Sequence, residues 1–299
     1  MRKLGAVVRE LLGLPEPGSE PVRSVAAKKG FHVVPIQTEG TRPKLFLVHG
    51  AGGNVLGFRE LSHYFGKDQP VYGLQARGVD GKQQPLETID EMAAAYLAEL
   101  REVQPHGPYF FGGYSGGGLV AYEMAQQLLQ VGERVAFLGM IDTPNPQMRQ
   151  RSKVARGLIH VGNLLRKGPM YPLRILRMKL DRRASAKRNE VARQSGGVMP
   201  QALRGEDVQF AFERAFYRHV VKAYPGHVDL FRAQQWIGGT RYIVDEALGW
   251  RPFVQGGMTI VECPGDHFTM CTEPNVQVLC RGYMAAMDRV LAGLHTSDR

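Results

Sequence analysis

This chain of 299 residues is poor in cysteine and contains no long hydrophobic run. Its three cysteines, Cys263, Cys271 and Cys280, are odd in number and form no CxxC pair, which favours reduced thiols over a disulfide framework or a thiolate metal site. No apolar stretch approaches the ~18–20 residues that cross a bilayer. Near the N-terminus, Arg9 and Glu10 interrupt the apolar core that an export signal requires. We therefore expect a cytoplasmic protein with no metal site and no membrane span.

Positive charge is in excess, and the excess lies in one segment. The net charge of the chain is +10. Residues 147–193 contain fourteen Lys or Arg against two acids, which leaves 24 basic and 26 acidic residues elsewhere. Hydrophobic residues make up 43% of the chain and charged residues 22%, as in ordinary globular proteins. The basic segment therefore bears on binding partners more than on the fold.

The most informative stretch is GGYSGGG, residues 112–118, which follows an apolar run at 108–111 and precedes a helix-like run. Strand, sharp Gly-x-Ser-x-Gly turn and helix together are typical of a nucleophile elbow. A serine at the tip of such a turn, here Ser115, needs neighbours without side chains, here Gly113 and Gly117. Its hydroxyl then lies above the positive end of a helix, where developing negative charge is stabilised. A glycine-rich turn with a bystander serine is the alternative, and the correct flanks favour the elbow.

Short apolar runs alternate with helical patterns along most of the chain. A capping box formed by Thr88 and Glu91 opens a helix whose apolar residues keep helical spacing. A closing helix begins after Pro274. This alternation predicts a mostly parallel sheet with helices on both faces. The predicted strands lie at residues 45–48, 71–74, 108–111, 135–141, 228–232 and 258–261.

Two segments depart from the alternation. Residues 1–42 combine an amphipathic stretch with a Pro/Gly/Ser-rich linker, so we place the catalytic domain at residues 43–299. Residues from about 147 to 223 have helical patterns only, including 154–165 and 207–224. We call residues 147–223 the lid insertion, because a helical insertion after a strand of such a sheet lies above the C-terminal ends of the strands.

A nucleophilic serine needs a base, and the base needs an orienting acid. In proteins with a nucleophile elbow of this kind, the chain order is Ser, then Asp or Glu, then His. His267 lies in the loop PGDHF directly after the last predicted strand, so we predict it as the base. Among the other histidines that follow Ser115, His219 falls in an amphipathic helix and His295 in the tail. His227 is a further candidate.

The spacing leaves two candidates for the acid. Asp142 directly follows the strand at 135–141, and Asp245 follows the apolar residues 242–244, which we interpret as another strand region. An aspartate just past a strand most often caps a turn, so either residue could have that role instead.

The chain resembles the in-line thioesterase domains that end modular polyketide synthases and nonribosomal peptide synthetases. The resemblance spans roughly residues 33–292, and its elbow, GYSGG, differs from the GHSMG typical of free-standing editing thioesterases. The matching stretches are LFLVHGAGG (45–53), QPHGPY (104–109), the elbow, AYEMA (121–125), Ile141-Asp142, LFRA (230–233), LGW (248–250) and PGDHFTM (264–270).

This resemblance implies an α/β-hydrolase fold with a helical lid insertion. It implies Asp142 as the acid, and the backbone N–H groups of Ala51 and Gly116 as oxyanion-hole donors. The implied reaction moves an acyl or peptidyl chain from carrier-bound phosphopantetheine onto Ser115 and releases it by hydrolysis or macrocyclisation. No cofactor or metal of the protein's own is implied. The chain is expected either as a free-standing enzyme or as a domain excised from a longer synthase, because residues 1–43 are too short for a carrier domain.

The implied partner is an acyl or peptidyl carrier protein. Carrier domains are typically acidic, so the basic segment 149–193 could dock one. A solvated lid whose charges serve solubility is the alternative, and we expect no nucleic acid partner. Two other functions remain open: a carrier-independent serine esterase or lipase of the same fold, and a non-enzymatic scaffold.

Overall fold

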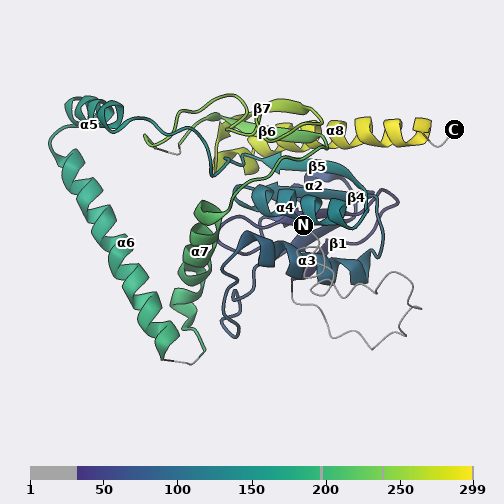
Figure 1. The fold of residues 1–299 in the computed structure, drawn as a ribbon, viewed down its shortest axis with the longest axis horizontal. Coiled ribbons are helices and arrows are strands. Elements are labelled where there is room, and N and C mark those ends of the chain that lie inside the picture. The colour runs from purple at the N-terminus through teal and green to yellow at the C-terminus, as the bar shows by residue number, and fades with distance from the viewer. Residues whose placement is uncertain (1–31, 196–197, 238, 298–299) are drawn as a thin grey trace.

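The structure is a computed structural model that describes residues 32–195, 198–237 and 239–297. The amphipathic stretch and most of the linker predicted before residue 43 lie outside the described residues. Within the described ranges, a seven-stranded sheet in the order β1-β3-β2-β4-β5-β6-β7 forms the centre of the molecule (Figure 1). The sheet carries the candidate site on one edge, so its strand order decides which loops meet.

All neighbouring strands are parallel except β1, which pairs with β3 in the antiparallel direction. The strands predicted at residues 45–48, 71–74 and 135–141 are confirmed at those bounds, while β6 and β7 start as predicted and run three and five residues further. The elbow strand also extends, to Tyr114. The strands are β1 (Val33–Gln37), β2 (Leu45–Val48), β3 (Val71–Leu74), β4 (Tyr109–Tyr114), β5 (Val135–Ile141), β6 (Val228–Gln235) and β7 (Met258–Asp266).

Strand β1 corrects the predicted domain boundary. It lies inside the segment 1–42 that the sequence assigns to a linker, yet it pairs along β3 from Val33 to Gln37. Pro35 sits within it, and proline lowers the strand signal because it cannot donate to a ladder. The position is tolerated because β1 is an edge strand with one free side. The catalytic unit therefore begins before residue 43.

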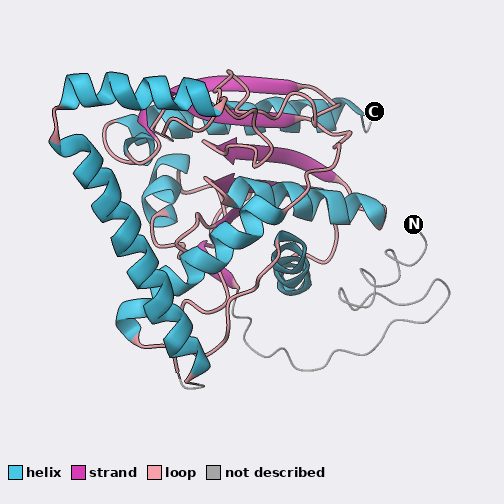
Figure 2. Ribbon diagram, turned by 60° about the vertical axis from the view of Figure 1, so that its left-hand side comes forward, coloured by secondary structure: helices cyan, strands magenta, loops and turns pink. Residues whose placement is uncertain are grey.

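Helices cover both faces of the sheet (Figure 2). One apolar core joins α3 (Ile89–Val103) and α4 (Gly117–Gln130) to the sheet, and a second core joins α2 (Phe58–Phe65) and α8 (Asn275–Ser297) to the opposite face. Strand β2 is buried on both faces, and its residues alternate between the two cores. The predicted cap of α3 is present, because the Thr88 hydroxyl accepts the Glu91 N–H.

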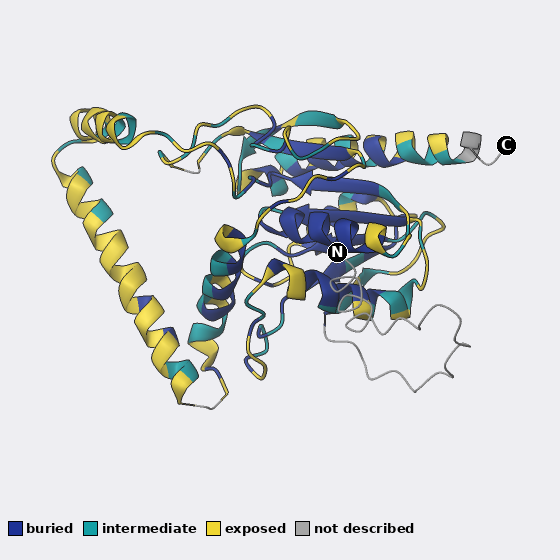
Figure 3. Cartoon of the chain, viewed as in Figure 1, coloured by how far each residue is buried: buried dark blue, intermediate teal, exposed yellow. Residues whose placement is uncertain are grey.

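The lid insertion leaves the sheet after β5 and returns at β6. Its described residues form α5 (Lys153–Lys167), α6 (Met170–Gln194) and α7 (Gln201–Arg218). The helix predicted to reach residue 224 ends at Arg218, and the chain continues in extended form from His219. Helix α7 buries apolar side chains against the body of the protein, whereas α5 buries no residue and α6 buries two. Figures 1 and 3 show α5 and α6 standing away from the body, and we call these two the outer helices.

Candidate active site

The turn between β4 and α4 has the form of a nucleophile elbow. Ser115 adopts a left-handed backbone conformation with φ 55°, and its N–H donates to the carbonyl of Ile141 at 2.7 Å. A Cβ atom on Gly113 would lie 2.3 Å from the carbonyl carbon of Gly117. A Cβ atom on Gly117 would lie 2.2 Å from the carbonyl oxygen of His49. Both glycines are therefore required at the positions that the sequence predicted.

Asp142 and His267 form a hydrogen-bonded pair beside this turn. Asp142 directly follows β5, and its side chain is 5% exposed. His267 Nδ1 donates to Asp142 Oδ2 at 2.7 Å, while Asp142 Oδ1 accepts the N–H of Ala233 at 2.9 Å. With its Nδ1 proton held by the carboxylate, a neutral imidazole has its Nε2 lone pair available as a base.

The loop that carries His267 is held from both sides. The imidazole stacks on the ring of Tyr114, with centroids 5.0 Å apart, and the Tyr114 hydroxyl donates to the carbonyl of His267 at 2.6 Å. Burial raises the pKa of Tyr114, so this hydroxyl keeps its proton. On the other side, Asp266 Oδ1 accepts the N–H groups of Phe268 and Thr269. These contacts place the imidazole before any substrate binds.

Ser115 and His267 line one cavity of about 510 Å³. The glycine-rich loop after β2 forms one wall, and Gln209 of α7 contributes from the lid insertion. Within the described ranges, Ser115 Oγ makes no hydrogen bond to His267. In serine sites without substrate this hydrogen bond is often long or poorly aligned. The cavity therefore brings together a serine and a histidine–aspartate pair from β4, β5 and β7.

The two backbone groups predicted as oxyanion donors, Ala51 N–H and Gly116 N–H, belong to residues beside this turn. Ala51 lines the cavity, and Gly116 follows the serine at the start of α4. In the part of the chain that the structure describes, neither N–H donates to a protein acceptor. The ring of Phe212 on α7 covers Gly116 so closely that a Cβ there would lie 2.3 Å from the ring. Helix α7 is thus the element of the lid insertion that covers the elbow.

The alternative acid, Asp245, lies elsewhere. No strand forms at 242–244 among the described residues, so the predicted strand is wrong. This segment pairs instead with the start of the lid insertion, since Ile243 N–H donates to the carbonyl of Arg149 at 2.8 Å. The Asp245 side chain is exposed and accepts the N–H of Gly249 at 3.0 Å. It caps a turn, as aspartates near strand ends commonly do.

The other histidines are also occupied elsewhere. His219 is buried between the carboxylates of Asp90 and Glu123, at 3.3 and 3.7 Å. His227 faces Thr259 on β7, and the backbone of His295 lies within α8 rather than in a tail. Among the described histidines, only His267 lines the cavity with Ser115.

Three residues that contact the cavity or the elbow are not identified from the sequence. The sequence indicates Tyr114 only as part of the elbow, whereas in the structure its ring and hydroxyl hold His267. Gln209 and Phe212 come from α7, whose inward face could have been found from its helical apolar spacing but not assigned to this cavity. His49 is buried, which lowers its pKa to about 4, and its Nε2 contacts the Tyr96 hydroxyl at 2.6 Å. We infer that His49 packs here as a neutral imidazole.

Over the described ranges, no group of three or more His, Cys, Asp or Glu residues could hold a metal ion. In the same ranges, every helix is too short or too polar to cross a membrane.

Comparison with known proteins points in the same direction as the geometry. Residues 43–286 match the family model described as a thioesterase domain. The dimodular nonribosomal peptide synthase of Bacillus subtilis (strain 168) is 32% identical over 260 residues, which cover 82% of this chain and 10% of that protein. Malpinin synthetase of Mortierella alpina is 47% identical over 112 residues, covering 38% of this chain and 1% of that protein. The chain thus spans a small part of these relatives.

Solved structures share the fold. The NocB thioesterase domain, in covalent complex with a fluorophosphonate nocardicin G analogue, gives a TM-score of 0.61 at 24% identity, over 86% of this chain and 99% of that one. The RedJ thioesterase from the prodiginine pathway of Streptomyces coelicolor gives 0.58 at 23% identity, over 89% and 97%. The predicted α/β-hydrolase fold with a mostly parallel sheet is confirmed.

Proposed function

Because the chain belongs to the thioesterase domain family, we propose that it releases an acyl or peptidyl chain from the phosphopantetheine arm of a carrier domain in polyketide or nonribosomal peptide biosynthesis. The observation that carries this proposal is the meeting of Ser115 and the His267–Asp142 pair at one cavity. The protein needs no cofactor of its own, since phosphopantetheine arrives with the substrate. A cytoplasmic location is part of the same proposal.

Acylation begins at Ser115. His267 Nε2 takes the hydroxyl proton as Oγ bonds to the thioester carbonyl carbon, and a tetrahedral oxyanion forms. When the intermediate collapses, the C–S bond breaks and the imidazolium returns its proton to the departing sulfur. Asp142 acts through the 2.7 Å contact to Nδ1, which holds the imidazole in the required tautomer and stabilises its charged form.

The oxyanion is held by the N–H groups of Ala51 and Gly116. Both amides lack a protein acceptor among the described residues, so they can donate to the substrate oxygen without first breaking a bond. A donor in such a position contributes about 3 kcal/mol of transition-state stabilisation in related chemistry. The positive end of α4, which begins at Gly117, adds to this effect.

The acyl-enzyme is resolved by a second attack on the Ser115 ester. Water as the nucleophile gives a free acid, and a hydroxyl or amine within the substrate gives a macrocycle. In both cases His267 removes the proton of the nucleophile and returns it to Ser115 Oγ.

The partner is an acyl or peptidyl carrier protein, and the basic segment 149–193 is where it docks. This segment includes both outer helices, and most of their basic side chains are exposed. Attraction between a basic lid and an acidic carrier would steer the acyl arm toward the cavity.

The function is tested by comparing two substrates with the same acyl chain, a pantetheine thioester and an oxygen ester of a simple alcohol, with released products identified by mass spectrometry. We expect faster turnover of the thioester. Equal or faster turnover of the oxygen ester would favour a carrier-independent esterase. Absence of labelling by a fluorophosphonate would favour a scaffold without activity.

A further inference from the structure

A groove runs between α6 and α7 on the side of α7 that faces away from the elbow. It has a volume of about 620 Å³ and is lined by α6 from Lys179 to Arg193 and by α7 from Asp207 to Arg218. We call it the lid groove. At 1.5 Å per helical residue its walls are about 21 Å and 16 Å long, which suits a segment of chain better than a single small ion. Figure 1 shows α6 and α7 close together where α6 ends and α7 begins, and further apart at the opposite ends.

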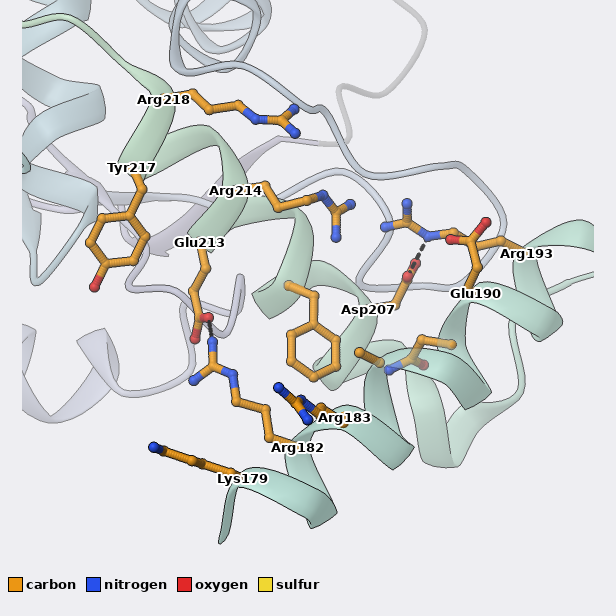
Figure 4. Close-up of a pocket in the computed structure, with 13 residues that line it drawn as sticks. Lys179, Arg182, Arg183, Glu190, Arg193, Asp207, Glu213, Arg214, Tyr217 and Arg218 are labelled. Carbon is orange, nitrogen blue, oxygen red and sulfur yellow. Dashed lines mark hydrogen bonds and ion pairs between the residues drawn. The ribbon is translucent and has the colours of Figure 1, made fainter. Parts of the chain in front are cut away.

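The lid groove carries an excess of positive charge. Six of its lining residues are basic and three are acidic. Figure 4 shows Arg182 reaching across to Glu213, and Arg193 to Asp207, so two of the acids are already paired. Lys179 and Arg183 make no ion pair with any described residue. These cations are available to carboxylates from outside the chain.

Two polar atoms at the lid groove lack partners, counting only the residues that the structure describes. Asn189 is 3% exposed, and its Oδ1 is buried without a hydrogen bond. Arg193 Nη2 is also buried without one. A buried polar atom without a partner costs about 1–3 kcal/mol, so a ligand that supplies a donor to Asn189 and an acceptor to Arg193 would remove this cost. Carboxylates beside N–H donors meet both requirements.

The lining also has an apolar component. Phe210 lies under the guanidinium of Arg182 at 5.8 Å, and Tyr217 is 57% exposed at the outward end. An elongated groove with cationic rims and aromatic patches matches an amphipathic helix whose polar face is acidic. A lipid surface is flat and does not enter a groove of this shape.

Resting on the thioesterase function proposed above, we infer that the lid groove is the docking site for an acidic amphipathic helix of the carrier domain. Helix α7 then separates the docked helix from the catalytic cavity. Its residues Gln209 and Phe212 face the cavity and the elbow, and Phe210 faces the lid groove. A helix is about 10 Å across, so the carrier docks close enough for its arm to pass over α7 to Ser115.

The test uses two double variants that each remove two positive charges from α6. Lys179→Gln with Arg183→Gln changes the lid groove, and Arg174→Gln with Lys187→Gln changes exposed residues outside it. Binding of a fluorescein-labelled acyl carrier domain is measured by fluorescence anisotropy. We expect Kd to rise about tenfold for the groove variant, since two charge contacts contribute up to ~1 kcal/mol each, and less than about twofold for the control.

Equal changes in the two variants would overturn the lid groove as the site, and so would tighter binding to anionic lipid vesicles than to the carrier domain. Asn189→Leu, which keeps the side-chain volume but removes Oδ1, should also weaken carrier binding without lowering the melting temperature, because it removes a buried polar atom that has no partner. Binding does not depend on catalysis. If no thioester is turned over but the groove variant still binds the carrier domain more weakly than the control variant, the proposed reaction is wrong and the lid groove remains the docking site.

Discussion

The catalytic edge of the sheet and the outer helices are held in different ways. At the edge, Asp142 accepts two hydrogen bonds, and His267 is fixed by a ring stack, a tyrosine hydroxyl and a turn. In the outer helices, α5 buries no side chain, and the two residues that α6 buries, Ser185 and Asn189, are both polar. Many independent contacts define the edge, whereas a few polar contacts define the position of α6.

Those few contacts lie in the C-terminal half of α6, from Arg182 to Arg193. Arg193 pairs with Asp207 of α7 and with Glu87, which precedes α3, and Arg214 of α7 also pairs with Glu87. Glu87 therefore joins the tip of the lid insertion to the body. Elements with little buried apolar surface open at low free energy. We conclude that the catalytic edge is preorganised, while the outer helices can adjust to a partner.

The largest expected effect falls at the catalytic edge. Asp142→Asn should lower kcat about 10⁴-fold, because loss of the orienting carboxylate leaves the histidine in the wrong tautomer. Asp245→Asn is the matched control, since Asp245 caps an exposed turn, and its kcat should change less than twofold. Steady-state kinetics on a pantetheine thioester measures both. Similar losses in the two variants would erase the distinction between the edge and the surface.

The next prediction compares the effect of a Gly→Ala substitution on the free energy of unfolding in the two regions. Gly117→Ala should destabilise the protein by about 3 kcal/mol, because its Cβ would meet the backbone of β2 and the residue after it at 2.2–2.5 Å. Gly157→Ala in α5 meets no atom within 4 Å and should stabilise that helix by up to about 1 kcal/mol. Urea unfolding gives both values. A loss of stability for Gly157→Ala would show that α5 packs more tightly than its exposure indicates.

A smaller effect is expected at the ion pairs of Glu87, which connect the lid insertion to the body of the protein. Burial alone would raise the pKa of Glu87, but hydrogen bonds from Arg214 and Arg193 lower it below the usual range. Glu87→Gln should therefore weaken protection of α6 and α7 in hydrogen exchange at pH 7, by about 1 kcal/mol for such half-exposed pairs.

The stabilisation that the Glu87 carboxylate provides should be lost as the pH falls. A carboxylate with a lowered pKa in the folded state stabilises that state fully above its unfolded pKa of about 4.3, and loses the contribution as the pH falls through the folded value. The wild type and Glu87→Gln should therefore differ at pH 7 and converge near pH 3. A difference that persists at pH 3 would assign the protection to other contacts.

The smallest effect is expected in the outer helices. Leu165 of α5 is 81% exposed, so Leu165→Gln should change the free energy of unfolding by less than about 0.5 kcal/mol. Leu47→Ala, at a residue with no exposed surface in β2, should cost about 2–5 kcal/mol. A comparable cost at Leu165 would mean that this face is covered in solution, and concentration-dependent sedimentation would identify a second copy as the cover.

Local sequence signals were sufficient for the parts of the fold that bury apolar runs. Strand β2 and the elbow glycines could be predicted because burial on both faces and a tight turn restrict residue type strongly. Asp142 and His267 follow strands whose C-terminal ends share one sheet edge, so their meeting could be anticipated. The resemblance was needed to choose between the two acids and to name Ala51 and Gly116 as the predicted oxyanion donors.

Other features depend on tertiary contacts that leave no local pattern. Strand β1 contains Pro35 and is permitted only because it lies at the sheet edge. The segment at 242–244 is apolar enough for a strand but pairs with the start of the lid insertion. The angle between α6 and α7 rests on polar pairs such as Arg182 with Glu213, which resemble solvated charges in a sequence. That pairing also makes Arg182 unsuitable for testing carrier docking, because its loss would move α6.

The most direct test of the central claim is intact-protein mass spectrometry after incubation with an acyl-pantetheine thioester. We expect the wild type to gain the mass of one acyl group and Ser115→Ala to gain none. The alanine variant should keep the wild-type melting temperature, because the substitution removes a hydroxyl and no packing volume. An acyl adduct on Ser115→Ala would contradict the account, since the nucleophile would then lie outside the elbow.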